Sequence, residues 1–291
     1  MLGTALRHSL DLRNIKILQL VRHPPSSPAE LSWNPNAPAP IPDTKPLEGL
    51  TAAIHLSGAN VAEHRWTADF KKQMVSSRVD STHALATMLA GLRQPPKALL
   101  VASAIGIYGN REDEILDEKS NPGTGFLADL CKQWEAAAQP AVDAGIRVVH
   151  LRFGVVLARQ GGALAKMLPI FRLGLGGPIA SGRQWISWIS LPDVVSAILF
   201  ALDHTDLSGA VNLTAPAPVT NRDYTKALAR AVHRPAILPA PAFALRLALG
   251  EMADEALLSS ARAVPAKLQA ASFQFAHPTI DSALAALLPG T

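Results

Sequence analysis

The sequence predicts an α/β protein, in which helices cover both faces of a parallel β-sheet. Short apolar runs bounded by glycine, proline or asparagine recur through the first half of the chain, and runs of this length are typical of buried strands. Longer segments with apolar residues at helical spacing lie between these runs. This alternation favours a parallel sheet, because a helix usually carries the chain back between parallel neighbours.

The chain begins with a helix that is expected to run to about residue 12, followed by a buried strand over residues 15–21. A proline-rich stretch over residues 24–49 predicts an extended surface connection, with one short strand near residues 31–33. The next strand covers residues 51–57 and ends in a turn of small residues.

Two long helices then alternate with two strong strands. The expected order is a helix over residues 67–93, a strand over 97–109 with a turn at its carboxyl end, a helix over 125–144, and a strand over 146–157. The second helix is expected to stop near Gly145, because glycine favours the backbone conformation that ends a helix.

The pattern changes in the second half of the chain. A helix, a glycine-rich turn and a short segment with two tryptophans precede a helix that begins at Pro192, a strand over residues 210–215, and a helix with a capping signal at Thr220. The remainder is rich in alanine and leucine and is expected to be mostly helical. We therefore expect one domain over residues 1–157, to which strand 210–215 returns, and a second over residues 158–291.

Composition limits the functions that need consideration. Hydrophobic residues make up 48% of the chain and charged residues 17%, as in globular proteins. The net charge of +4 comes from scattered residues, so we expect no nucleic-acid partner. An apolar run of about eighteen residues and a signal peptide are both lacking, so we expect no membrane contact. Cys131 is the single cysteine and fits a reducing, cytoplasmic location. We predict no metal site.

Several segments together point to one family. They are HLSGANVAEHRWT, SSRVDST, ASAIGIYG, GFLADLCKQWE, LRFGVVLARQGGALAKMLPIFRLGLGGPIASGRQWISWI and NLTAPAPVTNRDYTKAL. With them the chain resembles the NADP-binding, epimerase-like family of atypical extended short-chain dehydrogenases/reductases. The resemblance runs over essentially the whole chain. It implies an NAD(P)-binding Rossmann fold, a doubly wound parallel sheet, with a smaller C-terminal substrate domain.

The resemblance also raises a question about the start of the chain. Members of the family begin with a strand and a Gly-x-x-Gly-x-x-Gly turn, and Gly3 matches the third of these glycines, which lets the first helix pack closely. We expect that the sequence begins at an internal methionine of a longer protein; the alternative is a shortened protein with a damaged cofactor site. Strands 15–21 and 51–57 would then flank an empty position in the sheet. Unpaired backbone groups there would cost about 1–3 kcal/mol each, so we expect low stability of the chain as written.

Arg22 indicates which dinucleotide the site prefers. Enzymes that use NAD usually carry an acidic residue at the end of the second strand, whereas an arginine there suits the 2′-phosphate of NADP. The stretch LVRHP has Arg22 and no acid, so we expect NADP; a solvated arginine at a strand end is the alternative.

The resemblance adds further cofactor-binding positions. They are Leu56, Ser57, Gly58 and Asn60 in the turn after strand 51–57, and Phe153 and Val155 near the end of strand 146–157. Ala59 stands where the family has a glutamate, so the polar contacts that the family makes in this turn are less safely assigned to this chain. Arg78 and Thr82 also match family positions, with a structural role as the alternative.

The catalytic residues are harder to place. Short-chain reductases use a Tyr-x-x-x-Lys pair, in which the lysine lowers the pKa of the tyrosine. Counting back from Glu135, these positions fall on Leu127 and Cys131, which cannot perform this chemistry; Lys132 is turned about 100° away. Ser103 and Tyr108 remain as catalytic candidates, and for Tyr108 a structural role in closing the turn is the alternative.

Two functions follow. The first is an NADP-dependent oxidoreductase or epimerase that acts on an unknown small-molecule substrate, with sugars among the candidates. The second is a non-catalytic NADP(H) sensor or protein-interaction module, as some division-related relatives suggest; the missing pair favours it. The helices over residues 67–93 and 125–144 are those that extended relatives use to form homodimers, although their apolar sides serve a core equally well.

Overall fold

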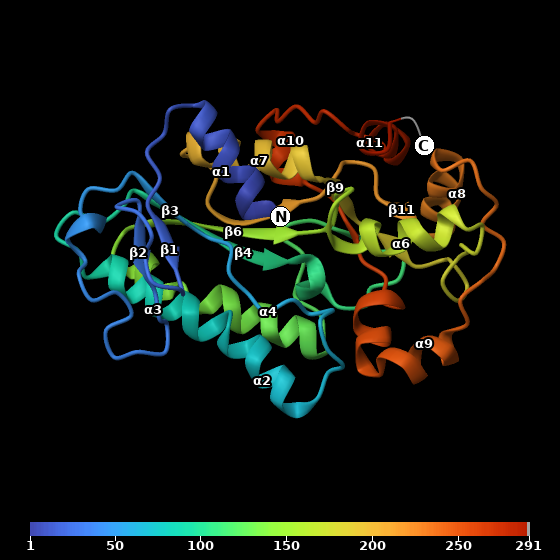
Figure 1. Cartoon of the computed structure of the whole chain (residues 1–291), viewed down its shortest axis with the longest axis horizontal. Coiled ribbons are helices and arrows are strands. Elements are labelled where there is room, and N and C mark those ends of the chain that lie inside the picture. Colours follow the sequence, from blue (N-terminus) through green and yellow to red (C-terminus); the bar gives the residue numbers. More distant parts are fainter. Residues whose placement is uncertain (290–291) are drawn as a thin grey trace.

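A computed structural model describes residues 1–289 and is built on a parallel sheet (Figure 1). The strands are β3 (Ala52–His55), β4 (Ala98–Ala104), β6 (Arg147–Phe153) and β10 (Gly209–Leu213). They lie in the order β10-β6-β4-β3, and all neighbouring pairs are parallel. The predicted fold class is confirmed.

The first strands form a separate pair. Strand β1 (Gln19–Val21) lies parallel to β2 (Glu30–Ser32), and Gln19 faces Glu30 in the register. Within residues 1–289, β3 pairs with β4 alone and β1 with β2 alone. Strands β1 and β3 therefore each have one edge without a ladder partner.

Helices cover both faces of the sheet, as Figure 1 shows. On one face lie α1 (Leu2–Leu12), α7 (Leu191–Asp203) and α10 (Ala266–Ala270), whose apolar side chains share a core with β4, β6 and β10. On the other face lie α3 (Val79–Ala90), α4 (Phe126–Ala136) and α5 (Gln139–Asp143). Alternate residues of each strand thus enter opposite cores, which explains the long apolar runs in the sequence.

Both long helices predicted from the sequence are broken. The first divides into α2 (Ala68–Ser76) and α3 at Ser77 and Arg78, because the Arg78 side chain turns inward and donates a hydrogen bond to the Met74 carbonyl. The second divides into α4 and α5, where Pro140 in the first turn of α5 has no N–H to continue the preceding helix. The positive φ of +79° at Gly145 agrees with the expected stop.

Gly154 divides the predicted strand over residues 146–157. A Cβ atom at Gly154 would lie 2.6 Å from the Ser187 carbonyl oxygen, so only glycine fits. Beyond it the chain leaves the main sheet and forms β7 (Val155–Leu157), which pairs with β9 (Trp188–Ser190). The carboxyl end of β6 therefore lies at the junction between the two halves of the molecule.

A second cluster of elements lies beyond this junction. It contains α6 (Gly162–Arg172), α8 (Asn221–Ala231) and α11 (Ile280–Leu287), which pack around Trp188. The remaining elements are η1 (Lys45–Leu47), η2 (Ile105–Tyr108), β5 (Ile115–Leu116), β8 (Trp185–Ile186), β11 (Val219–Thr220), α9 (Ala242–Leu249), η3 (Ala253–Leu257) and β12 (Arg262–Ala263). The capping signal at Thr220 is confirmed, because its side chain accepts from the Asp223 N–H.

The C-terminal segment returns to the sheet half. The Glu255 carboxylate accepts a hydrogen bond of 3.1 Å from the N–H of Leu127, in the first turn of α4. The Ser260 hydroxyl donates to the Glu112 carbonyl at 2.6 Å, and β12 pairs with β5. The predicted division after residue 157 stays a prediction, since α7, β10 and α10 also pack on the main sheet. Residues 290 and 291 of the predicted second domain lie outside the described residues.

Candidate functional site

A pocket of about 520 Å³ lies at the carboxyl end of β1 and opens toward the turn after β3. Its lining residues are Gln19, Leu20, Val21, Arg22, His23, Trp33 and Ser57. The pocket brings together Arg22 and Ser57, two of the residues that the sequence marks for cofactor binding. Ligands of doubly wound sheets bind outside the carboxyl ends of the strands, so this position is the expected one.

Arg22 offers a free positive charge to this pocket. Its side chain is exposed, and within residues 1–289 its guanidinium has no hydrogen-bond or ion-pair partner. Trp33 is 5% exposed and also lines this pocket. An unpaired guanidinium beside a pocket is suited to a phosphate, which accepts its planar pair of N–H groups.

The buried Arg78 side chain supports the turn after β3. A Cβ atom at Gly58 would lie 3.1 Å from the Arg78 Cζ atom, and Arg78 donates to the Ala59 carbonyl at 2.8 Å. Burial lowers the pKa of Arg78, whose guanidinium lies 5.1 Å from the centre of the Trp134 ring. The structure thus places Arg78 under the turn, as a residue that shapes it.

The other predicted residues of this turn lie at different depths. Leu56 is partly buried and packs against both main cores, whereas Ser57, Gly58 and Asn60 are exposed. The Asn60 side chain accepts from the Ala62 N–H at 3.1 Å and so stabilises its own loop. Exposed backbone at Ser57 and Gly58 leaves room for a ligand to pass close by.

Three further predicted residues lie apart from the pocket walls. Phe153 is partly buried at the end of β6, and Val155 is 36% exposed at the start of β7. Gly3 lies in the first turn of α1, but a Cβ atom there would meet nothing within 4 Å. The role of Gly3 in helix packing and cofactor binding stays a prediction, and no neighbouring atom among the described residues approaches it.

Ser103 and Tyr108 belong to one buried polar network. The Ser103 hydroxyl donates to Glu135 at 2.7 Å, and Arg152 donates two hydrogen bonds of 2.8 Å to the two oxygens of the same carboxylate. Arg152 also donates to the Tyr108 hydroxyl at 3.0 Å, which in turn donates to Asn212 at 2.8 Å. The network joins β4, η2, α4, β6 and β10.

Burial and charge act against each other in this network. Burial on its own would raise the pKa of Glu135, but the hydrogen bonds and charge of Arg152, with a contribution from Ser103, leave that pKa lowered. Burial raises the pKa of Tyr108, and Arg152 offsets only part of this effect. Ser103 is 1% exposed and Tyr108 0%, so both hydroxyls are committed to protein partners. Their predicted catalytic roles stay predictions, and for Tyr108 the geometry favours the structural alternative.

The residues at and beside the Lys position of the missing Tyr-x-x-x-Lys pair do not replace its acid–base function. Cys131 is buried, which together with the Glu135 charge raises the pKa of its thiol to about 12. Lys132 forms an ion pair of 2.6 Å with Asp129 on the outer side of α4, consistent with the expected turn away from the site. Neither residue is placed to exchange a proton with a ligand at the sheet edge.

Sequence reasoning missed three members of the network. Glu135 served only to count positions, and Arg152 and Asn212 were not considered. Arg152 could have been found, because a charged residue inside the apolar run IRVVHLRFGVVL needs a buried partner. Asn212 carries no comparable signal. Within residues 1–289, no group of three or more His, Cys, Asp or Glu residues is placed to hold a metal ion.

A parallel sheet covered by helices on both faces, together with a second cluster of helices, is the architecture of extended short-chain dehydrogenases/reductases, which bind dinucleotides. Residues 1–213 match the NAD dependent epimerase/dehydratase family, and residues 240–287 match a domain of unknown function, DUF1731. The chain belongs to the NAD dependent epimerase/dehydratase family, which confirms the family resemblance seen in the sequence.

Known relatives span nearly the whole chain. Epimerase family protein ML0860 of Mycobacterium leprae is 46% identical over 284 residues, which cover 98% of this chain and 91% of that protein. The crystal structure of human epimerase family protein SDR39U1, isoform 2, with NADPH has a TM-score of 0.91 and 32% identity, and covers 100% of this chain and 97% of that chain. The nucleoside-diphosphate sugar epimerase of Corynebacterium glutamicum has a TM-score of 0.81 and 33% identity, with coverage of 99% and 56%.

Proposed function

We propose that the chain binds NADP(H) along the carboxyl edge of its sheet, with Arg22 as the contact to the 2′-phosphate. The observation that carries this proposal is the unpaired Arg22 guanidinium in a pocket shared with Ser57. An acidic residue, which would favour a ribose hydroxyl, is absent from the lining of this pocket. The human relative, whose structure contains NADPH, supports the same choice.

Other described residues are suited to the adenosine and nicotinamide halves of the dinucleotide. The exposed backbone at Ser57 and Gly58 can lie against the adenosine half, and we assign Phe153 and Val155, at the end of β6 and the start of β7, to the nicotinamide half. When bound, the nicotinamide supplies hydride chemistry. The protein contributes the charge at Arg22, the turn supported by Arg78, and the Trp33 ring beside the pocket.

On this basis we propose an NADP-dependent oxidoreductase or epimerase that acts on a small, sugar-like molecule in the cytoplasm. The Corynebacterium relative, named as a nucleoside-diphosphate sugar epimerase, and a cluster of helices beyond β6 support this reading. The second candidate is an NADP(H) sensor or interaction module without catalysis. It is favoured by one observation, that the Ser103 and Tyr108 hydroxyls are bound inside the protein.

Replacement of Arg22 tests the cofactor. Arg22→Ala removes a charge-assisted contact to phosphate, so NADPH should bind about 10- to 100-fold more weakly, while the weaker binding of NADH should change little. Fluorescence titration of both nucleotides measures this. Arg93→Ala, at an exposed position remote from the pocket, should leave both affinities unchanged. Equal losses for NADPH and NADH would count against the assigned role of Arg22.

A further inference from the structure

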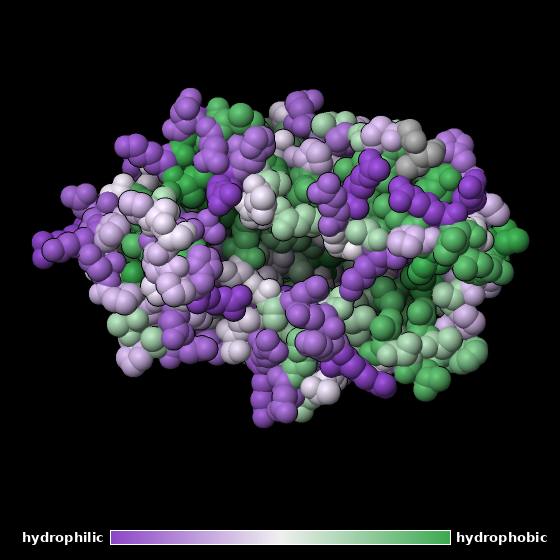
Figure 2. Space-filling model, in the orientation of Figure 1, coloured by the Kyte–Doolittle hydropathy of each residue, from purple (hydrophilic) through white to green (hydrophobic). Residues whose placement is uncertain are grey.

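An unusually apolar surface lies beside the second cluster of helices. We define the α6–α9 surface by Ile170, Leu173, Leu175, Ile237, Leu238, Phe243 and Leu247. Each of these side chains is at least 50% exposed, and Leu247 reaches 77%. Figure 2 shows green, hydrophobic side chains gathered over this part of the molecule. Among residues 1–289, these are seven of the thirteen exposed large hydrophobic residues, so the exposure is concentrated.

Backbone contacts make this surface continuous. Leu238 donates to the Gly176 carbonyl at 3.1 Å, and Ala240 donates to the Pro178 carbonyl at 2.9 Å. The loop after α6 therefore runs alongside the segment that leads into α9. Side chains from both segments form one patch, which α9 extends.

Helix α9 is the least typical element of the fold. Its sequence AFALRLAL is apolar at every position except Arg246, yet none of its residues is buried. A helix that is hydrophobic all round is normally covered by other protein. Arg246 forms an ion pair of 2.9 Å with Asp254, so the helix offers little surplus charge to an anionic membrane surface.

The size of the α6–α9 surface fits a protein interface. Seven large side chains, exposed to this degree, offer an area on the order of 800 Å², which exceeds the roughly 300–600 Å² of the largest patch on a typical monomer. A stable interface buries about 800 Å² on each partner. Apolar character of this kind is typical of permanent homodimers, whereas transient partners meet through more polar surfaces.

We propose that the α6–α9 surface is the contact between two copies of this chain, related by a twofold axis and centred on α9. A twofold contact joins the same patch on both copies, so the seven apolar side chains of one copy would meet those of the other. This proposal is independent of the nucleotide site.

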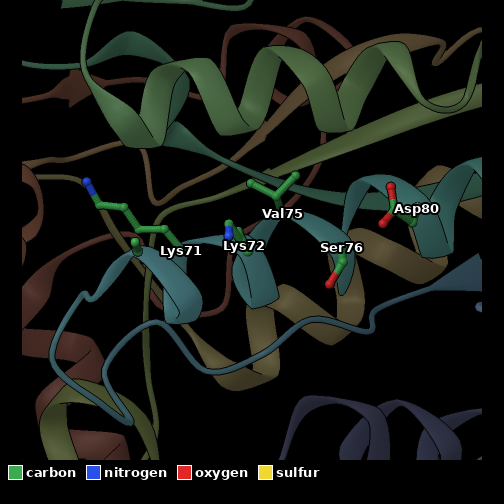
Figure 3. A pocket seen from close by; sticks show the side chains of 6 residues that line it. Lys71, Lys72, Val75, Ser76 and Asp80 are labelled. Atoms are coloured by element: carbon green, nitrogen blue, oxygen red, sulfur yellow. The ribbon is translucent and has the colours of Figure 1, made fainter.

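Part of the surface first expected to form a dimer carries several charged side chains. Lys71, Lys72, Val75, Ser76 and Asp80 line a shallow hollow of about 530 Å³ along α2 and the start of α3 (Figure 3). Charged residues are depleted from the centres of protein interfaces. Dimerisation through these helices stays a prediction, against which the α6–α9 surface can be tested directly.

Analytical ultracentrifugation of the full chain over a range of concentrations tests the proposal. The wild type should sediment as a dimer. Phe243→Glu combined with Leu247→Glu places charges in the contact and should weaken the dimer by at least about tenfold. Both positions are more than 70% exposed in the single chain, so folding should persist, as circular dichroism would show. If the double variant does not fold, the milder Leu247→Gln serves in its place.

Val142→Glu is the matched control. Val142 is 46% exposed on α5, within the helix pair first expected to dimerise, and this variant should remain dimeric. A monomeric wild type, a dimer that survives the double substitution, or a dimer lost only in Val142→Glu would each overturn the proposal. Wild-type monomers that bind anionic phospholipid vesicles would overturn it in favour of a membrane surface.

Discussion

At the scale of single residues, the ion pair between Arg152 and Glu135 is the most consequential contact near the site. Its side chains are 8% and 14% exposed, and Glu135 accepts from both Arg152 and Ser103. A buried pair gains little over an apolar pair, but removal of one partner leaves an isolated buried charge. The pair therefore makes the site sensitive to single substitutions.

Glu135→Gln should lower the free energy of unfolding by about 3–5 kcal/mol, because Arg152 loses its compensating charge. Urea unfolding measures the change. Asp129→Asn is the control on the same helix; it breaks an exposed pair with Lys132 and should cost no more than about 1 kcal/mol. Equal effects of the two variants would contradict the importance given to burial.

Tyr108→Phe distinguishes the structural from the catalytic role of this hydroxyl. Without it, Arg152 and Asn212 each lose a hydrogen bond, so the free energy of unfolding should fall by about 1–3 kcal/mol. Tyr224→Phe is the matched control, because the Tyr224 hydroxyl is buried without a hydrogen-bond partner among the described residues and its removal should cost little. NADPH turnover that disappears in a stably folded Tyr108→Phe protein would favour catalysis.

His55 should make stability depend on pH. Burial lowers the pKa of His55 to about 4 from its ordinary 6.5, so the unfolded chain binds a proton more readily than the folded one. The stabilisation, on the order of 3 kcal/mol, is complete above pH 6.5 and is lost as the pH falls toward 4.

Urea unfolding near neutral pH and near pH 5 should show this loss for the wild type and less of it for His55→Gln. Burial also lowers the pKa of His150, which will keep part of the pH dependence in that variant. His8→Gln, at an exposed position in α1, should behave as the wild type. A His55→Gln protein with the full wild-type pH dependence would show that His55 is not the group responsible.

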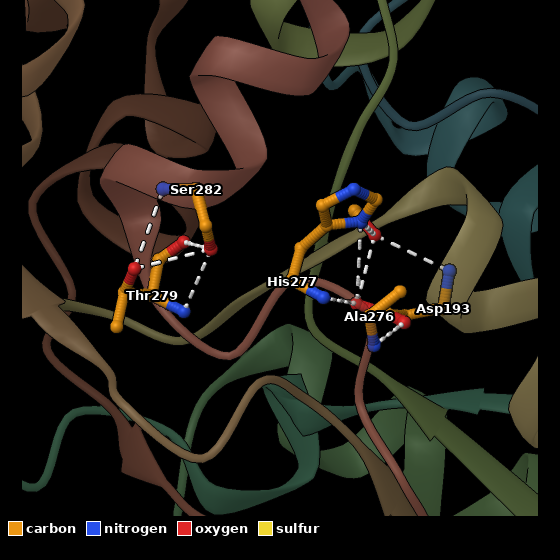
Figure 4. Close-up of polar contacts among 6 residues, drawn as sticks. Asp193, Ala276, His277, Thr279 and Ser282 are labelled. Carbon is orange, nitrogen blue, oxygen red and sulfur yellow. Dashed lines mark hydrogen bonds and ion pairs between the residues drawn. The ribbon is translucent and has the colours of Figure 1, made fainter.

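At the scale of secondary-structure elements, α7 is held by a buried aspartate at its start. Asp193 is 1% exposed and accepts from the N–H groups of Ala276 at 2.8 Å and His277 at 3.0 Å (Figure 4). Ser190, the N-cap of α7, lies 2.9 Å from His277 Nδ1. The start of α7 and the segment before α11 are thus joined through one carboxylate.

Asp193→Ala should free this segment. The lost hydrogen bonds to a charged group are worth about 1.5–3 kcal/mol, and hydrogen exchange over residues 276–287 should become faster. Asp223→Ala is the matched control, since Asp223 occupies the same position in α8 but is exposed, and its effect should stay near about 1 kcal/mol. Unchanged exchange in Asp193→Ala would contradict the link.

The secondary-structure elements that could be predicted from the sequence are those whose position depends on neighbouring residues alone, such as an apolar run or a helix cap. Apolar runs located β3, β4 and β6, and the Thr220 cap located the start of α8. The break at Arg78 could not be predicted, because its side chain is held inward by two carbonyls, that of Met74 and that of Ala59 in the turn after β3. Arg22 was proposed as a cofactor contact from its place at a strand end and Ser57 from the family resemblance, whereas the partners of Ser103 required tertiary structure.

At the scale of the whole molecule, two halves meet where β6 ends. Figure 2 shows a hollow near the middle of the molecule, between the half that contains the sheet and the half that contains α6 and α9. None of the helices within residues 1–289 has the length and apolar character to cross a membrane. The proposed nucleotide site lies on the sheet half, and the proposed dimer contact lies on the other.

The contacts of Glu255 and Ser260 bear on how this chain can be cut or recombined. A protein ended before residue 240 would lose the acceptor at the first turn of α4 and the strand that completes β5. A chimera that takes residues 240–287 from a distant relative could lose the same contacts. The loops near Glu112, whose carbonyl accepts from Ser260, would have to come from the same parent. Residues 240–287 and the half that contains the sheet should therefore fold as one unit, because each supplies hydrogen-bond partners to the backbone of the other.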